Sequence, residues 1–210
     1  MPILIPLFVG ILNYRILTKP LRLILAFVLY GTLNEIIVHF FIFTIKLNNT
    51  MPFSHLYGLV TFLILGFFYV CILNGFIFKR ITYTLVIIYA VFYLVNSLFI
   101  QNIYIYPSVA RTIGAILIIL FALSFFIKVM QEASIEKLHR EPLIWINLAI
   151  LIYYSGNFFY YFLFNIILDY SREFSKLTVI YYSVLNAAFY LLIAVGFWRA
   201  RPIVKKNMVL

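Results

Sequence analysis

Charged residues are scarce in this chain. Only 10% of its 210 residues are Asp, Glu, Lys or Arg, whereas 66% are hydrophobic. A soluble domain carries roughly 25% charged residues, and the mean hydropathy here is +1.09. The composition therefore excludes a soluble globular protein and predicts a polytopic membrane protein with the lipid bilayer as its surroundings.

Cysteine and histidine are also rare. The single Cys71 cannot form an intramolecular disulfide. His39, His55 and His139 are too few for a membrane hydrolase that holds zinc with three His and an Asp on one side. Gly-rich phosphate loops and serial acidic pairs of a proton-driven transporter are missing as well. We therefore assign no catalytic residues, no metal ligands and no cofactor.

What the chain has in abundance is long apolar segments. Each is near or above the ~20 residues that cross ~30 Å of hydrocarbon, and prolines stand just before several of them, where the first turn of a helix tolerates proline. We expect one all-α transmembrane domain, residues 1–210, a seven-helix bundle with no soluble insert. The helices are expected at about 2–18, 21–45, 53–78, 81–101, 108–131, 142–167 and 177–199.

The first segment is the weakest of the seven. Its apolar stretch from Met1 to Tyr14 is short, and Arg15 follows at once. An alternative is a bundle of six spanning helices with the N-terminal segment lying at the membrane surface.

Lys and Arg residues predict the orientation of the bundle, because such residues in short loops stay in the cytoplasm. Four of the sixteen fall on one side, namely Lys46, Arg111, Arg172 and Lys176. The other twelve fall on the opposite side: Arg15, Lys19, Arg22, Lys79, Arg80, Lys128, Lys137, Arg140, Arg199, Arg201, Lys205 and Lys206. This predicts an outside N-terminus and an inside C-terminus. The net charge of +10 then indicates contact with anionic lipid, and nucleic acid is not an expected partner.

The segment 21–45 carries the most polar of the predicted membrane residues. Thr32, Glu35 and His39 are spaced to share one helix face. Glu35 is the acidic residue expected within the hydrocarbon, so it must be protonated or paired. We predict that it pairs with His39 or with Arg111, which is expected at a similar depth. Glu35 has three interpretations: a structural residue that holds helices together, a ligand or proton-responsive site, and a catalytic acid.

Other polar residues are spread through the predicted helices. Asn96, Asn157 and Asn186 are expected in the polar core of the bundle, as hydrogen-bond partners between helices or as a cavity lining. The two last helices also carry hydroxyls at several depths, on Tyr153, Tyr154, Tyr160, Tyr161, Tyr181, Tyr182 and Tyr190. Hydrogen bonds between helices and a ligand-lined cavity are the two interpretations of this tyrosine set.

One stretch of sequence resembles a known family. The segment from Glu141 to Asn147, Glu-Pro-Leu-Ile-Trp-Ile-Asn, is followed by residues 151–159, Leu-Ile-Tyr-Tyr-Ser-Gly-Asn-Phe-Phe, and later by Gly196-Phe197-Trp198. This is similar to the sixth and seventh helices of uncharacterised bacterial seven-helix membrane proteins that are associated with sensor histidine kinases. The resemblance implies a signalling role, a separate sensor kinase as a partner at the cytoplasmic face, and a place in the bacterial inner membrane. It brings no established site residues.

Three classes of function follow. The first is a sensor or receptor-like signalling accessory without its own catalytic domain. The second is a small-molecule or lipid transporter, which would use the scattered Asn and Tyr residues. The third is a lipid-modifying enzyme with Glu35 and His39 as acid and base. The sequence leaves the ligand and the oligomeric state open.

Overall fold

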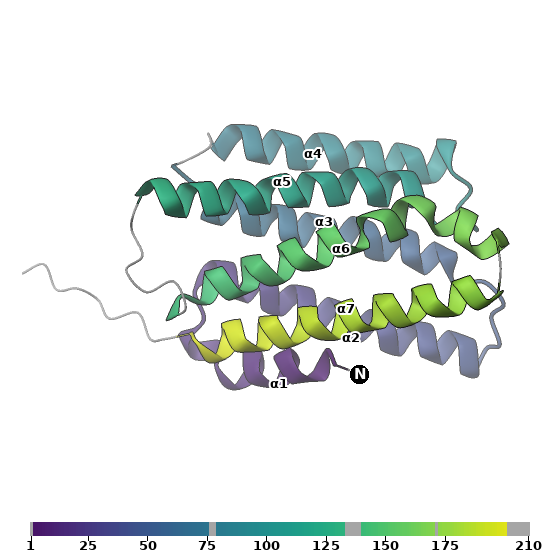
Figure 1. Ribbon diagram of the computed structural model, residues 1–210, viewed down its shortest axis with the longest axis horizontal. Coiled ribbons are helices and arrows are strands. Elements are labelled where there is room, and N and C mark those ends of the chain that lie inside the picture. The colour runs from purple at the N-terminus through teal and green to yellow at the C-terminus, as the bar shows by residue number, and fades with distance from the viewer. Residues whose placement is uncertain (1, 76–78, 133–139, 171, 201–210) are drawn as a thin grey trace, which may run out of the picture.

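The computed structural model of the protein describes residues 2–75, 79–132, 140–170 and 172–200. Within these residues the chain forms seven α-helices and no strand, which confirms the predicted all-helical bundle (Figure 1). The helices are α1 (Leu4–Leu12), α2 (Lys19–Phe43), α3 (Met51–Ile72), α4 (Lys79–Val95), α5 (Ser108–Glu132), α6 (Pro142–Tyr170) and α7 (Arg172–Trp198). A 3-10 turn, Tyr14–Ile16, follows α1, and a π-helical turn, Asn96–Ile100, continues α4.

Six of these seven helices are long and apolar enough to cross a membrane, so the protein is an integral membrane protein. The exception is α1, whose 9 residues rise about 14 Å at 1.5 Å per residue. That is about half of the ~30 Å hydrocarbon thickness. α1 is also shorter than the predicted 2–18, because the chain leaves the helix at Asn13, whose amide donates a hydrogen bond to the Val9 carbonyl.

Proline begins several helices, as the sequence predicted. Pro20 and Pro52 lie in the first turns of α2 and α3, and Pro142 is the first residue of α6. The missing N–H costs nothing there, because the first N–H groups of a helix have no partner within it. The C-terminal end of α3 was predicted less well, at residue 78, whereas the helix ends at Ile72 and Gly75 adopts a φ of 93°.

The helices pack in a ring that α1 closes, because it lies between α2 and α7. α1 packs against α2 and α7, α2 against α3, α3 against α5, α5 against α6, and α6 against α7, while α4 lies against α3 and α5. Gly10 allows the close approach of α1, because a Cβ atom there would lie 2.7 Å from Leu25 Cδ1 and 3.0 Å from Phe197 Cε2. α1 runs alongside its neighbours over only part of the bundle, and its N-terminal end lies near mid-length (Figure 1).

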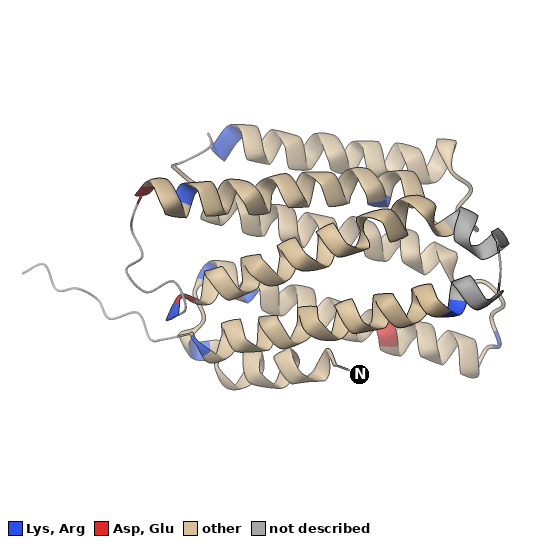
Figure 2. Ribbon diagram, in the orientation of Figure 1, with Lys and Arg blue, Asp and Glu red and all other residues tan. Residues whose placement is uncertain are grey.

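Basic residues gather at one end of the bundle (Figure 2). We call this the basic end: α2, α4 and α6 begin there, and α3, α5 and α7 end there. Its described Lys and Arg residues are Arg15, Lys19, Arg22, Lys79, Arg80, Lys128, Arg140 and Arg199. The described Lys and Arg residues thus divide between the two halves of the bundle as the loop assignment predicted. Residues 133–139 and 201–210, which hold Lys137, Arg201, Lys205 and Lys206, lie outside the described residues.

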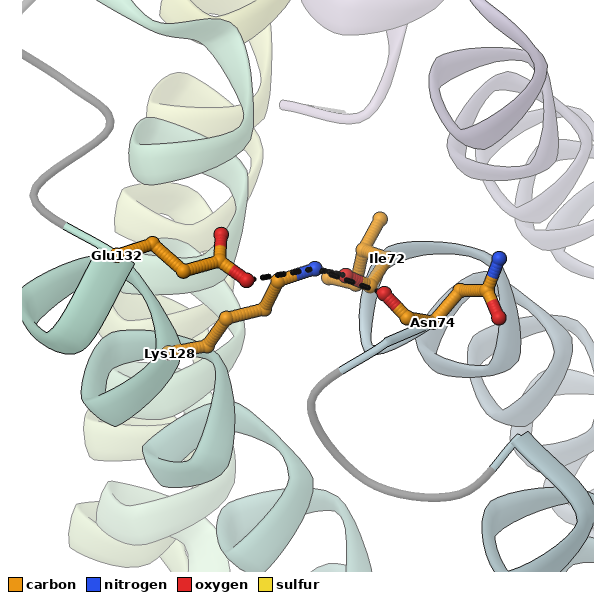
Figure 3. Close-up of polar contacts among 4 residues, drawn as sticks. All are labelled: Ile72, Asn74, Lys128 and Glu132. Carbon is orange, nitrogen blue, oxygen red and sulfur yellow. Dashed lines mark hydrogen bonds and ion pairs between the residues drawn. The ribbon is translucent and has the colours of Figure 1, made fainter.

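Lys128 holds the C-terminal end of α3 to α5 (Figure 3). Its ammonium group donates hydrogen bonds to the carbonyl oxygens of Ile72, at 2.9 Å, and of Asn74, at 3.1 Å. It also lies 3.9 Å from a carboxylate oxygen of Glu132. The last carbonyls of a helix have no partner within it and carry partial negative charge. Lys128 supplies hydrogen bonds to the Ile72 and Asn74 carbonyls from a neighbouring helix and so stabilises the C-terminal end of α3.

A buried polar contact joins three helices in the half of the bundle near the basic end. The Tyr69 hydroxyl on α3 donates to the Asn147 side-chain oxygen on α6 at 2.8 Å. The Asn147 amide in turn donates to the Ala122 carbonyl on α5 at 3.0 Å. Tyr69 and Asn147 are both fully buried, among apolar residues such as Ile24, Leu65, Phe68, Ile118, Ile150, Ile193 and Phe197. This half of the bundle is therefore a packed apolar core in which two consecutive hydrogen bonds join α3, α6 and α5.

Candidate functional site: a polar cavity away from the basic end

A cavity of about 300 Å³ lies among α2, α3, α5, α6 and α7, in the half of the bundle away from the basic end. Volumes of this size hold small molecules. Its charged and amide-bearing residues are Asn34, Glu35, Arg111 and Asn186. Its tyrosines are Tyr57, Tyr106, Tyr160, Tyr182 and Tyr190. A polar lining of this density is unusual inside a membrane bundle, where such groups are costly and tend to serve function.

On the side of the basic end, the cavity stops where α1 begins. Gly31 on α2 lines the cavity, and a Cβ atom there would lie 2.9 Å from Ile3 Cδ1, just before α1. The same position is 3.6 Å from the Tyr190 hydroxyl and 3.7 Å from the Tyr57 hydroxyl. Ile3 is 1% exposed. Since α1 packs against α2 and α7 only on the basic side of this point, its short length leaves room for the cavity beyond it.

Arg111 lies in the first turn of α5 and is held by aromatic rings. Its guanidinium carbon lies 5.4 Å from the ring centre of Tyr57, 5.5 Å from that of Tyr106 and 5.9 Å from that of Tyr161. These are cation–π distances. Nη2 donates hydrogen bonds to the carbonyl and hydroxyl oxygens of Ser54, at 3.0 and 3.3 Å. Nε is buried without a hydrogen-bond partner and lies on the side of α3, where a Cβ atom at Gly58 would be 2.9 Å from it.

Glu35 lines the same cavity from α2, but the predicted pairing with Arg111 is not formed. The one ion pair among the described residues is that of Lys128 and Glu132, and Glu35 Oε2 is buried without a hydrogen-bond partner. The reason lies in the packing: α2 packs mainly on α1 and α3, and α5 mainly on α6 and α3. The cavity therefore separates a carboxylate and a guanidinium that the sequence placed at similar depth.

His39 does not pair with the Glu35 carboxylate either. Its Nδ1 lies 2.8 Å from the main-chain carbonyl oxygen of Glu35, one turn earlier on α2, and so donates to it. The His39 ring is exposed on the outside of the bundle and lies 5.9 Å from the Phe43 ring. Thr32 is buried, and its hydroxyl donates to the Val28 carbonyl of the same helix. Of the three polar residues predicted on one face of α2, only Glu35 lines the cavity.

The three predicted asparagines have different surroundings. Asn186 lines the cavity from α7. Asn157 is buried, and its amide donates to the Tyr153 carbonyl of the same helix. Asn96 is buried at the π-helical turn, where its amide donates to the Gln101 side-chain oxygen at 2.9 Å. The side-chain oxygens of Asn96 and Asn157 lack partners, but neither residue lines this cavity.

The tyrosines of α6 and α7 join the two helices, and some of them also line the cavity. Tyr181 donates to the Gly156 carbonyl at 2.7 Å, which joins the two helices. Tyr182 lines the cavity, accepts a hydrogen bond from the Tyr153 hydroxyl at 3.1 Å, and stacks on Tyr160 with ring centres 5.0 Å apart. Adjacent residues of one helix thus have separate roles, because successive side chains point about 100° apart.

Tyr57, Tyr106 and Ser54 belong to the site but were not predicted. Tyr57 and Ser54 stand near the start of α3, and Tyr106 lies in the loop before α5. Burial raises the pKa of the Tyr106 hydroxyl, although the nearby Arg111 guanidinium lowers it. Tyr106 is therefore a neutral group beside Arg111. The signal that could have identified these residues is their position near the same end of the bundle as Arg111.

The cavity leads towards the end of the bundle opposite the basic end. A second hollow of about 290 Å³ lies between the loop before α3 and the loop before α5. Both hollows are lined by Thr50, Met51 and Tyr106. The Asn49 amide donates to the Tyr104 carbonyl at 2.9 Å and ties the two loops together. The second hollow therefore adjoins the cavity on the side away from the basic end.

No protein-family model matches this chain, and searches of curated proteins and of solved structures find no match either. Within the described residues, three or more His, Cys, Asp or Glu side chains do not gather as metal ligands would. What the site can do chemically therefore follows from its own groups. It offers a cation held by aromatic rings, a carboxyl group, two amides and several hydroxyls around one cavity.

Proposed function

We propose that the protein is a receptor-like sensor embedded in the membrane. It binds a small molecule in the cavity and acts through a separate protein at the basic end. The observation that carries the proposal is the pair of charged residues on one cavity, Glu35 and Arg111, which form no ion pair with each other. Glu35 Oε2 is also buried without a hydrogen-bond partner, which is costly, and a bound ligand would satisfy it.

The charge distribution supports the orientation. The described basic residues are concentrated at the basic end, and Lys and Arg in short loops stay in the cytoplasm. We therefore place the basic end and the C-terminus inside the cell, and the mouth of the cavity outside. This fits the inner membrane of a bacterium, as the resemblance implies.

The packing of the basic half supports sensing over transport. Fully buried residues such as Phe68, Tyr69, Ile146 and Ile193 fill the space between the cavity and the basic end. A transporter would need a path through this core. The lipid-modifying enzyme would need Glu35 and His39 to act together, but the His39 ring bonds to the main chain and faces outwards.

α7 is the element best placed to carry a signal. It lines the cavity through Tyr182, Asn186 and Tyr190, and it continues to the basic end, where Trp198 is exposed. A ligand that shifts α7 would thus change the surface that faces a partner. By the resemblance to kinase-associated membrane proteins, a separate sensor kinase is the proposed partner.

Site-specific photo-crosslinking in native membranes tests the sensor role. Crosslinking residues would replace Arg80, Arg140 and Trp198 at the basic end, with Asn48 and Tyr104 at the opposite end as matched controls. We expect a discrete protein adduct from the basic end and none from the opposite end. Lipid adducts alone at all five positions would overturn the sensor proposal.

A further inference from the structure

The two charged residues of the cavity have opposite signs and do not neutralise each other. Glu35 on α2 and Arg111 on α5 form no ion pair, and both line the space between the helices. Glu35 Oε2 has no hydrogen-bond partner, and the Arg111 guanidinium is met by tyrosine rings and the oxygens of Ser54 but by no carboxylate. A ligand with one positive and one negative group would neutralise both.

The two walls differ in the group that each would recognise. The planar guanidinium of Arg111 suits a carboxylate or phosphate, and three tyrosine rings and Ser54 fix its position. An ionised Glu35 accepts hydrogen bonds only, and an ammonium group beside it would favour that ionised form. Asn34 and Asn186 add amides to the same lining. Because each charged wall is specific for one sign, the site favours a ligand with both groups over one with a single charge.

We propose that the cavity binds a small zwitterion, with its anionic group at Arg111 and its ammonium group at Glu35. This inference rests on the proposed function and names the ligand class. The volume of about 300 Å³ suits a molecule the size of an amino acid. Two sources share this chemistry: a free amino acid from the water at the mouth of the cavity, or the phosphoethanolamine headgroup of a lipid.

Ligand binding by the full-length protein, purified in an uncharged detergent, tests the class. The probes are phenylalanine, 3-phenylpropanoate, 2-phenylethylamine and O-phosphoethanolamine. The first three share one carbon skeleton. Phenylalanine carries both charges, 3-phenylpropanoate only the negative one and 2-phenylethylamine only the positive one. We expect a zwitterion to raise the melting temperature, and each single-charge analogue to bind about tenfold more weakly, as for a lost hydrogen bond to a charged group. This comparison needs no variant.

Variants then assign the two walls. Glu35→Gln should weaken binding of the zwitterion and of the amine but leave binding of 3-phenylpropanoate unchanged. Arg111→Gln should weaken binding of the zwitterion and of 3-phenylpropanoate but leave binding of the amine unchanged. Glu132→Gln and Arg80→Gln are matched controls outside the cavity and should bind as the unmodified protein does. Equal zwitterion binding by Glu35→Gln, Arg111→Gln and the controls would overturn the assignment.

Nanodiscs distinguish the two sources. If the headgroup is the occupant, phosphatidylethanolamine should reduce the affinity for the free zwitterion relative to phosphatidylglycerol. If a free amino acid is the occupant, the two lipids should give equal affinity. Either result supports the class.

Two outcomes overturn the zwitterion proposal. One is binding of a single-charge analogue as tightly as its zwitterion, which would leave a cavity that binds ligands of another class. The other is no change in melting temperature with any of the four probes. The crosslinking experiment answers separately whether the basic end has a protein partner, so failure of the ligand class and failure of the sensor role are distinguishable.

Discussion

Glu35 on α2 and Arg111 on α5 line one cavity from different helices and form no ion pair. In most membrane bundles, ionisable residues at this depth pair with each other or with the main chain. Arg111 meets this requirement in part through the Ser54 carbonyl, whereas Glu35 Oε2 has no partner. In the proposed function, the two separated charges are two walls of one binding site and not a structural ion pair.

The tyrosine cage predicts that lysine cannot replace arginine at position 111. Arg111→Lys keeps the charge but loses the planar group that faces Tyr57, Tyr106 and Tyr161. We expect a loss of about 1 to 2 kcal/mol in unfolding free energy, from weakened cation–π contacts. Thermal unfolding of the purified protein measures it, with exposed Arg80→Lys as the control. An unchanged melting temperature for Arg111→Lys would show that the cage contributes nothing.

The buried contact between Tyr69 and Asn147 predicts energetic coupling. Tyr69→Phe leaves the Asn147 side-chain oxygen without its donor at 2.8 Å, at a cost of about 1 to 2 kcal/mol. Asn147→Leu also removes the bond to the Ala122 carbonyl. In a double-mutant cycle, the combined variant should lose less than the sum of the two single variants. Simple additivity would show that the hydrogen bond has no net worth.

The cap on α3 predicts an effect at the basic end. Lys128→Met removes the donor to the Ile72 and Asn74 carbonyls, and we expect a loss of about 1 to 2 kcal/mol. Hydrogen exchange should rise locally at the last turn of α3. Lys79→Met, at an exposed lysine of the same end, is the control and should change neither quantity. Equal exchange in both variants would mean that α3 ends at Ile72 without help from Lys128.

The sequence predicted the helices well because each depends on local composition. Apolar length placed six spanning segments, and Pro20, Pro52 and Pro142 marked helix starts. The short α1 could not be predicted in the same way, since its end depends on the Asn13 side chain turning back to the Val9 carbonyl. The π-helical turn at Asn96 likewise depends on a contact, the bond to Gln101.

The site was predicted in part. Glu35, Arg111 and Asn186 were named as polar core residues, and all three line the cavity. Their arrangement depends on which helices are neighbours and on the rotation of each helix, neither of which composition gives. The expected pair of Glu35 with Arg111 assumed that α2 and α5 pack together, but α3 lies against both instead. Tyr57 was missed for the same reason.

Cysteine reactivity at Asn186 tests the central claim most directly. In a Cys71→Ala background, Asn186→Cys should react with a small water-soluble thiosulfonate that is added from the face marked by Asn48→Cys. It should not react from the face marked by Arg80→Cys, and Ala149→Cys, at a fully buried position of the core, should react from neither face. Saturating zwitterion should slow the reaction at Asn186→Cys and leave Asn48→Cys unchanged. No reaction at Asn186→Cys, or reaction only from the Arg80 face, would contradict an outward-facing ligand cavity.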